Sequence, residues 1–168
     1  MRKFEFVKRV ENIENLKLPE RSTKNSAGYD FFAIEDVEIV PVGHDIYTSY
    51  NDHNLGSIVH RNTKPTVVKT GVKAKMLHNE FLLLANRSSN PGKKDLVLAN
   101  GVGIIDSDYY GNPDNDGEIM FPFYNVGTEP IEIKKGDKLG QGIFMKYALT
   151  DDDNAVGERT GGFGSTGK

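Results

Sequence analysis

The sequence predicts an all-β protein, either a sandwich or a distorted barrel. Short runs rich in Val, Ile, Phe and Tyr recur along the chain, and many of them are bounded by Gly, Pro, Asn or Asp. No segment shows a sustained helical period. The chain has 168 residues, which fits one domain with a modest hydrophobic core.

The strand-like runs start near residue 29 and continue to residue 147. Their β-branched and aromatic residues favour a pleated, half-buried surface. We expect strands at Tyr29–Ala33, Val37–Val40, Thr66–Val72, Glu80–Leu84, Leu96–Ala99, Glu118–Tyr124, Ile131–Ile133 and Leu139–Tyr147.

Two polar stretches are predicted to be loops inserted between strands. The first, Gly43–Lys64, holds three of the four histidines, whose separations match no usual zinc spacing. The second, Asn112–Gly117, is a cluster of turn residues. A third polar stretch, Thr150–Glu158, carries three consecutive aspartates, which we interpret as a solvated linker rather than a magnesium site.

Composition excludes several classes of function. The net charge of -3 provides no global basic field for nucleic acid, so an anionic ligand must be held by a local site. The absence of cysteine excludes disulfides, thiolate metal sites and a cysteine nucleophile. The first residues do not have the pattern of a secretory signal, and no apolar run approaches the ~20 residues of a membrane span. We therefore expect a cytoplasmic protein that binds neither nucleic acid nor membrane.

The glycine-rich tail, residues 159–168, is the most informative segment. Its end matches the G-x-x-x-x-G-K part of a P-loop, but the sequence stops at Lys168, without the Ser or Thr and the helix that a P-loop needs. Successive glycine N–H groups and the hydroxyls of Ser165 and Thr166 still suit an anion, and Phe163 offers a stacking surface. Terminal glycine runs are usually disordered, but that alternative leaves Phe163 and Arg159 unexplained.

A second constellation lies at residues 100–111. Two apolar residues precede Asp106, and the spacing of Gly101 and Gly103 suits a tight hairpin. Such a hairpin can present backbone N–H and C=O groups to a flat base, while the carboxylate orients and deprotonates a water molecule. The alternative is an ordinary hairpin with an aspartate at its turn.

Three weaker constellations complete the set. Residues 86–92 place an arginine and two serines after an apolar run, which is a plausible phosphate clamp. Residues 135–142 form a β-turn followed by a strand, in which a buried Gln141 would need a hydrogen-bonding partner. Residues 26–33 place Asp30 inside a strand-like run, where a buried carboxylate needs a compensating partner or a metal.

Taken together and in this order, the five segments resemble the five motifs of the trimeric dUTPase family. They spread from Ala27 to Gly167, and the most specific are Asp106–Gly111 and the glycine-rich tail. The resemblance implies a β-clip or jelly-roll-like subunit, a homotrimer with active sites shared among three subunits, and magnesium-dependent hydrolysis of dUTP to dUMP and pyrophosphate. It divides the chain into a β domain, residues 1–157, and a C-terminal arm, residues 158–168, that closes a neighbouring active site.

The resemblance also implies roles for individual residues. Asp106 would hold the attacking water in line with the α-phosphorus. Tyr109 would pack against the deoxyribose and leave no room for a 2′-hydroxyl. The backbone from Asn100 through Gly103 to Ile105 would bind the edge of the uracil ring.

The phosphate-binding residues implied by the resemblance come from several segments. Asp30 would assist the magnesium ion through water. In the arm, Phe163 would cover the uracil, while Arg159 would lie near the outer phosphates. Further residues that would contact the substrate come from the two other subunits of the trimer. They are Arg87, Ser88, Ser89, Gln141, Gly164, Ser165 and Thr166.

Some features depart from the family pattern. The tail is one residue shorter than the usual Arg-Gly-x-Gly-Gly-Phe, which puts the role of Arg159 in question. Asn86 stands where proline is common, and Ser89 stands where glycine is common. Loops 43–64 and 112–117 are insertions relative to compact members, as in phage-like and Gram-positive-type relatives.

Two other functions compete with dUTP hydrolysis. The related dCTP deaminases share the fold, but their third motif carries a catalytic glutamate just after a Trp or Tyr, which the stretch from Asp106 to Gly111 lacks. A protein-binding, regulatory role of the inserted loops belongs to a different class of function and could coexist with catalysis.

Overall fold

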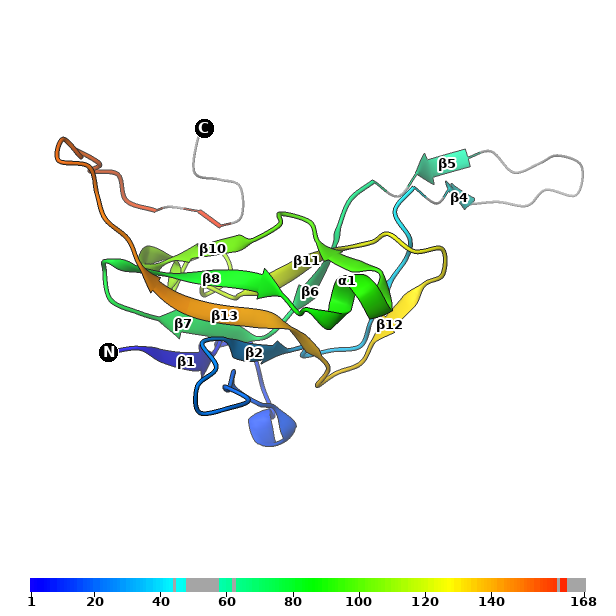
Figure 1. Cartoon of the computed structure of the whole chain (residues 1–168), viewed down its shortest axis with the longest axis horizontal. Helices are drawn as coiled ribbons and strands as arrows, with labels where there is room; N and C mark the ends of the chain where they lie inside the picture. Colours follow the sequence, from blue (N-terminus) through cyan, green and yellow to red (C-terminus); the bar gives the residue numbers. More distant parts are fainter. Residues whose placement is uncertain (44, 48–57, 62, 160, 163–168) are drawn as a thin grey trace, which may run out of the picture.

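The computed structural model describes residues 1–43, 45–47, 58–61, 63–159 and 161–162 (Figure 1). Over these residues the chain forms strands and turns with a single short α-helix, which confirms the predicted all-β class. The strands are β1 Lys3–Phe6, β2 Tyr29–Phe32, β3 Val37–Ile39, β4 Asp45–Tyr47, β5 Ile58–Arg61, β6 Thr66–Lys69, β7 Val72–Lys75, β8 Glu80–Asn86, β9 Leu96–Leu98, β10 Gly103–Asp106, β11 Met120–Asn125, β12 Ile131–Ile133 and β13 Lys138–Lys146; the helix is α1 Ser89–Lys94, and two 3₁₀ turns are η1 Ile13–Asn15 and η2 Ser107–Tyr109.

An antiparallel four-stranded sheet carries the candidate site residues Asp30, Gly103, Ile105, Asp106 and Gln141. Its strand order is β10-β8-β13-β2, so β10 and β2 lie at opposite edges. Asp106 on β10 pairs with Phe81, and Gln141 on β13 pairs with both Ala85 on β8 and Asp30 on β2. The sheet therefore holds Asp106 at one edge and the Gln141–Asp30 pair at the other.

A three-stranded sheet, β6-β11-β9, packs against the four-stranded sheet. Phe31 and Phe121 are fully buried at the interface, with ring centroids 5.7 Å apart. A Cβ added to Gly140 would lie 2.2 Å from the Phe121 ring, so only glycine lets β13 approach that ring. Side chains from the two inner faces thus form one hydrophobic core, as in other two-layered β-proteins.

The predicted strand Thr66–Val72 is wrong, because the chain forms two strands there. It turns at Gly71, whose φ is +68°, and a Cβ at this position would lie 2.3 Å from Ile34 Cδ1. After the turn β7 pairs with the N-terminal strand β1, which the sequence analysis did not predict.

The predicted hairpin around Gly101 and Gly103 is also wrong. The turn itself is present, since Gly101 has a φ of +69° and donates its N–H to the Leu98 carbonyl at 2.9 Å. The strands on either side of it do not pair with each other, because β9 pairs with β11 and β10 pairs with β8. The turn connects the two sheets, which lets Leu98 and Ile105 both contribute to the core.

The two inserted loops have different structures. Within loop 43–64, β4 and β5 pair as an antiparallel ribbon, and Figure 1 shows this ribbon extending away from the two sheets. Loop 112–117 is a compact turn in which Asp116 N–H bonds the Asn112 carbonyl at 2.7 Å and Gly117 has a φ of +81°. None of the described helices is long and apolar enough to cross a membrane.

Candidate active site

Asp106 ends the edge strand β10, and its carboxylate points outward. Residues of this strand alternate, so Gly103 and Ile105 are buried while Ile104 and Asp106 are exposed. The 3₁₀ turn η2 begins directly afterwards and brings Asp108 beside Asp106. Their side chains are 50% and 57% exposed, which leaves both carboxylates accessible to a ligand.

Arg159 of the C-terminal arm binds both of these carboxylates. Its Nη2 donates to Asp106 Oδ2, and its Nε donates to Asp108 Oδ1 at 2.8 Å. The guanidinium also lies 5.7 Å from the centre of the Tyr109 ring, and only 14% of the side chain is exposed. In Figure 1 the arm passes beside β10 of its own chain. Closure over a neighbouring subunit stays a prediction, because these contacts lie within one chain.

Tyr109 forms a fixed wall next to Asp106. The residue is 4% exposed, and its hydroxyl donates to the Glu118 carbonyl at 3.3 Å and accepts from Asn115 Nδ2 at 2.6 Å. Burial raises the pKa of the phenol, so the side chain is neutral at physiological pH. Such a wall can restrict the space beside a sugar, as the resemblance implies.

The backbone of β10 has one side that no described strand covers. Strand β10 is the edge of its sheet over the described residues, and β8 pairs with only one of its sides. An edge strand presents N–H and C=O groups in alternation, which suits the polar edge of a flat pyrimidine. Gly103 and Ile105 are buried within this strand, and Asn100 belongs to the turn before it.

At the opposite edge, Asp30 is the centre of a polar cluster with three hydrogen-bond donors. Its Oδ2 accepts from Ser22 Oγ and from Lys138 Nζ, both at 2.6 Å, and its Oδ1 accepts from Gln141 Nε2 at 3.1 Å. Burial disfavours the charged carboxylate, but the hydrogen bonds from Lys138, Ser22 and Gln141 outweigh this effect and lower the pKa of Asp30 below its ordinary value. The sequence predicted that a buried Asp30 and a buried Gln141 each need a hydrogen-bonding partner. In the structure the two side chains bond to each other, and Lys138 is a further partner of Asp30.

Gly28 makes room for this cluster. A Cβ at position 28 would lie 2.7 Å from Gln141 Oε1 and 2.9 Å from its Cδ, so any larger residue would displace the amide. The segment around Gly28 and the strand around Gln141 thus form one structural unit.

The serine–arginine segment lies at the end of β8. Arg87 donates from Nη1 to the Lys138 carbonyl at 3.4 Å, while Ser88 is exposed at the start of α1 and Ser89 is partly buried. Asn86, which replaces a common proline, donates from Nδ2 to the Leu96 carbonyl at 2.9 Å. The buried Asn90 in turn donates to Asn86 Oδ1 at 2.8 Å, so the departure at position 86 anchors this loop.

One chain does not bring Asp106 and the Gln141 cluster together. Asp106 pairs with Phe81, whereas Gln141 pairs with Ala85, four residues further along β8 and on its other side. Strand spacing and rise place the two positions about 16 Å apart. This distance is too large for the two groups to act on adjacent atoms of one triphosphate.

The described residues offer no preformed metal cage. No group of three or more His, Asp or Glu side chains among them could hold a metal ion. Asp30 already accepts three hydrogen bonds of the roughly four that a carboxylate can take, which leaves about one position for a water molecule. This arrangement fits an outer-shell contact to a hydrated magnesium ion that is held mainly by substrate phosphates.

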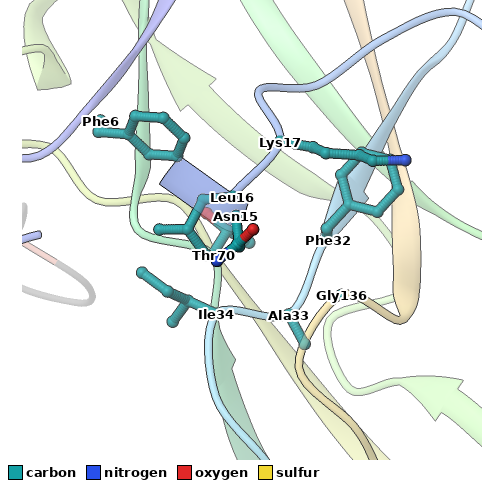
Figure 2. A pocket seen from close by; sticks show the side chains of 9 residues that line it. All are labelled: Phe6, Asn15, Leu16, Lys17, Phe32, Ala33, Ile34, Thr70 and Gly136. Carbon is teal, nitrogen blue, oxygen red and sulfur yellow. The ribbon is translucent and has the colours of Figure 1, made fainter. Parts of the chain in front are cut away.

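A small cavity lies away from these residues, between the η1 segment and β2 (Figure 2). Its volume is about 70 Å³, below the roughly 300–1,000 Å³ of most ligand pockets. None of the candidate site residues lines it, so we assign it no part in the activity. The cavity is lined by Phe6, Asn15, Leu16, Lys17, Phe32, Ala33, Ile34, Thr70 and Gly136.

Four predicted site residues lie in the part of the arm that the structure does not describe, and three contacting residues were not predicted. Phe163, Gly164, Ser165 and Thr166 lie outside the described residues, so their predicted roles stay predictions. The sequence analysis missed Lys138, Asn112 and Asp114, which contact the candidate site residues or the arm. For Asn112 and Asp114, the one indication in the sequence was that both lie in the predicted polar turn cluster 112–117.

The described residues thus form an all-β subunit in which Arg159 of the glycine-rich arm bridges the exposed carboxylates of Asp106 and Asp108. The sequence model of the dUTPase family matches residues 42–167, which is three quarters of the chain. The chain therefore belongs to the dUTPase family.

Individual relatives agree with this assignment. The deoxyuridine 5′-triphosphate nucleotidohydrolase of Lactococcus lactis is 42% identical over 99% of this chain and 98% of its own length. The enzyme of the same name from Desulfitobacterium hafniense is 34% identical over 90% of this chain and 87% of its own. The crystal structure of the Streptococcus mutans dUTPase is 37% identical and superimposes with a TM-score of 0.70, covering 88% of this chain and 98% of that one.

Proposed function

We propose that this chain hydrolyses dUTP to dUMP and pyrophosphate, with Asp106 activating the attacking water. The observation that carries the proposal is the half-exposed carboxylate of Asp106, at the outward end of an edge strand and beside Tyr109 and Arg159. The water oxygen forms a bond to the α-phosphorus and gives its proton to the carboxylate. The bond from the α-phosphorus to the oxygen bridging to the β-phosphate breaks, and pyrophosphate leaves.

Recognition of the nucleoside uses the same edge. The uncovered backbone of β10 and the preceding turn can pair with the uracil, and the fixed ring of Tyr109 can lie against C2′ of the sugar. A wall held by hydrogen bonds at its hydroxyl cannot retreat to admit an additional 2′-oxygen. This geometry favours a deoxyribonucleotide over a ribonucleotide.

The phosphates are bound by residues that follow β8 and by Gln141 on β13, contributed by a neighbouring subunit. Arg87, Ser88, Ser89 and Gln141 provide donors, and Asp30 fixes the orientation of Gln141. Magnesium, when bound, withdraws charge from the phosphoryl group under attack, and Asp30 would contact it through water. Donors aimed at the phosphates also stabilise the pyrophosphate that leaves.

Two observations support a homotrimer with shared sites. The first is the separation of about 16 Å between Asp106 and Gln141 within one chain, which a second copy can overcome. The second is the outward face of the four-stranded sheet, which is apolar where a solvated face would be polar. Leu83 lies on this face between Ile104 and Ile143 in register, and Ile104 is 52% exposed.

The C-terminal arm completes the site. Its glycines and hydroxyls suit the triphosphate, and Arg159 already lies at the catalytic edge. When dUTP binds, Arg159 exchanges its carboxylate partners for phosphate oxygens, which carry more charge. Closure excludes bulk water while the reaction proceeds.

The substrate assignment is tested by measuring pyrophosphate release. The purified chain with magnesium should release pyrophosphate from dUTP far faster than from dTTP, dCTP or UTP. Ammonia release from dCTP is measured in parallel, because it identifies the deaminase reaction of the alternative relatives. Equal rates with all four nucleotides, or ammonia without pyrophosphate, would contradict the proposal.

Sharing of the site is tested by mixing two inactive variants. Asp106→Asn chains retain the arm, and chains truncated after Gly157 retain Asp106. If the arm acts on a neighbouring subunit, mixed trimers recover about a quarter of the wild-type activity, since random mixing pairs the two intact parts in that fraction of sites. If the arm acts only on its own chain, mixing restores nothing.

A second candidate function is protein binding by loop 43–64. The β4–β5 ribbon extends away from the body of the subunit, where a partner can reach its strand edges (Figure 1). Deletion of residues 43–64 should abolish capture of such a partner in a pull-down and leave hydrolysis of dUTP intact. Unchanged capture by the deletion variant would rule out this role.

A further inference from the structure

A β-bulge in β13 brings Lys138 and Gln141 to the same carboxylate. The two residues are three positions apart, so the alternation of a regular strand would place their side chains on opposite faces of the sheet. The register of β13 against β2 shifts between Lys138 and Gly140, which gives β13 one extra residue at this point. As a result, both side chains reach Asp30.

The donors around Asp30 divide its two oxygens between them. Lys138 Nζ and Ser22 Oγ both donate to Oδ2, each at 2.6 Å. Gln141 Nε2 donates to Oδ1 at 3.1 Å. The two donors on Oδ2 fix the rotation of the carboxylate group and thereby direct Oδ1 at Gln141.

The bond to Asp30 decides which end of the Gln141 amide faces the carboxylate. An ionised carboxylate only accepts hydrogen bonds, so the amide nitrogen must turn towards it. That nitrogen carries two N–H groups, and the bond to Asp30 uses one of them. The second N–H is the donor that Gln141 can offer to a phosphate. Its direction therefore depends on where the Asp30 carboxylate is held.

Lys138 supplies the positive charge that this buried carboxylate needs. The Asp30 side chain is 4% exposed, whereas Lys138 is 37% exposed. Ser22 and Gln141 donate to Asp30 as neutral groups. Removing the cation from a buried ion pair leaves a charge without compensation, which is costly. Without Lys138, the Asp30 carboxylate would turn towards water, and Gln141 would lose its fixed partner.

We propose that Lys138 is a positioning residue that holds the Asp30 carboxylate in place, so that Asp30 aims the Gln141 amide at the triphosphate. This inference rests on the proposed function, because it takes Gln141 as a ligand of the phosphates. Lys138 acts on the substrate only through Asp30 and Gln141. Its effect on binding therefore cannot exceed that of Gln141 itself.

The central test replaces the ammonium and keeps the length of the side chain. Lys138→Met should weaken binding of a non-hydrolysable dUTP analogue with magnesium about two- to tenfold, because Gln141 loses about one hydrogen bond to phosphate. Lys138→Arg keeps a cationic donor and should bind within about twofold of wild type. Lys135→Met is the matched control and should bind as wild type, since Lys135 is an exposed lysine in the turn just before β13.

Double variants with Gln141→Ala decide whether Lys138 acts through Gln141. If it does, Lys138→Met should have no further effect on analogue binding in a Gln141→Ala chain. If it weakens binding by the same factor in that chain, Lys138 touches the substrate itself or acts on the whole fold, and the proposal is overturned. Unchanged binding by Lys138→Met alone overturns it as well.

A second variant keeps the test decisive if Lys138→Met does not fold, which melting temperatures show. Ser22 is exposed and donates to the same oxygen of Asp30, so Ser22→Ala should weaken binding about twofold, and only while Gln141 is present. A clear effect of Gln141→Ala without these effects leaves the proposed function standing and overturns the role of Lys138. If Gln141→Ala itself leaves analogue binding unchanged, Gln141 is not a phosphate ligand, and that part of the proposed function fails together with the role of Lys138.

Discussion

The two edges of the four-stranded sheet each carry an aspartate, and the two aspartates are in opposite situations. Asp106, on β10, is half exposed, and its carboxylate is bound by Arg159 of the glycine-rich arm. Asp30, on β2, is 3% exposed and accepts hydrogen bonds from Ser22, Lys138 and Gln141. The Asp106 carboxylate is accessible to a reactant, whereas the Asp30 carboxylate is buried and already accepts three hydrogen bonds.

This difference supports the roles proposed for the two carboxylates. A general base needs an accessible lone pair and a partner that can leave, and Arg159 can leave when phosphates arrive. A buried carboxylate that accepts from three donors instead fixes the geometry of its neighbours. Asp30 therefore orients Gln141 and Lys138, whereas Asp106 is the residue that can take a proton.

The largest expected effect tests the reactive edge. Asp106→Asn should lower kcat about 10²–10⁴-fold, as for loss of a positioned general base, while the dUTP analogue still binds. Asp108→Asn is the matched control, because Asp108 is similarly exposed and is also bound by Arg159. Steady-state pyrophosphate release compares the two. If both variants lose activity equally, the carboxylates act through Arg159 and not through a proton.

Truncation after Gly157 tests what covers that edge. The described part of the arm adds only Arg159 as a well-covered side chain, so we expect the fold and the trimer to persist while turnover falls by about 10²-fold or more. Light scattering and pyrophosphate release measure the two properties. Closing the arm fixes several residues at roughly 1–2 kcal/mol each, so proteolysis near Arg159 should be slow only with the analogue and magnesium present. Equal cleavage with and without ligand would favour a disordered tail.

Tyr109 tests the specificity of the reactive edge. Tyr109→Ala should raise the ratio of UTP to dUTP activity by roughly tenfold through loss of steric exclusion, and should also weaken dUTP binding. Tyr109→Phe keeps the ring and loses only the contacts of the hydroxyl with Glu118 and Asn115, so its ratio should stay near wild type. An unchanged ratio in the alanine variant would make Tyr109 purely structural.

The edge that carries Asp30 makes the smallest and most distinctive prediction. The pKa of Asp30 is lowered in the folded chain, so its contribution to stability is present above the unfolded value of about 3.9 and is lost as pH falls through the folded value. Asp30→Asn should remove this pH-dependent contribution to stability. It should lower the free energy of unfolding by about 1–3 kcal/mol at neutral pH. Urea unfolding between about pH 3 and 7, the range in which carboxylates titrate, measures both the pH dependence and the loss of stability. The same pH slope in both proteins would mean that Asp30 is not the group responsible.

Local patterns predicted most strands of the two packed sheets, missed β1, β4 and β5, and did not show which strands pair. The alternation in Glu80–Leu84 and Leu139–Tyr147 marks each strand, because each buries one face by itself. Pairing depends on where the chain turns, and the positive φ of Gly71 and Gly101 sends the following strands to other sheets. That is why the continuous strand across Gly71 and the hairpin at Gly101 were both predicted wrongly.

The site shows the same division. Residue type and sequence neighbours were enough to predict Asp106 as a candidate catalytic carboxylate. They also predicted that a buried Asp30 needs a partner. The partner Lys138 lies 108 residues from Asp30, and Asn112 lies 49 residues from Gly161, so no local pattern encodes either contact. Side-chain hydrogen bonds of this kind depend on the finished packing of the two sheets.

The turn at Gly101 has a consequence for the evolution and engineering of this enzyme. Because β9 and β10 belong to different sheets, the backbone proposed to bind uracil takes its shape only after both sheets have formed and packed. Nucleobase binding is therefore a property of the complete domain, and neither a peptide spanning residues 96–111 nor an isolated sheet should retain it. A ligand that binds this turn stabilises only the fully folded state, so dUMP or an analogue could serve as a folding chaperone for destabilised variants.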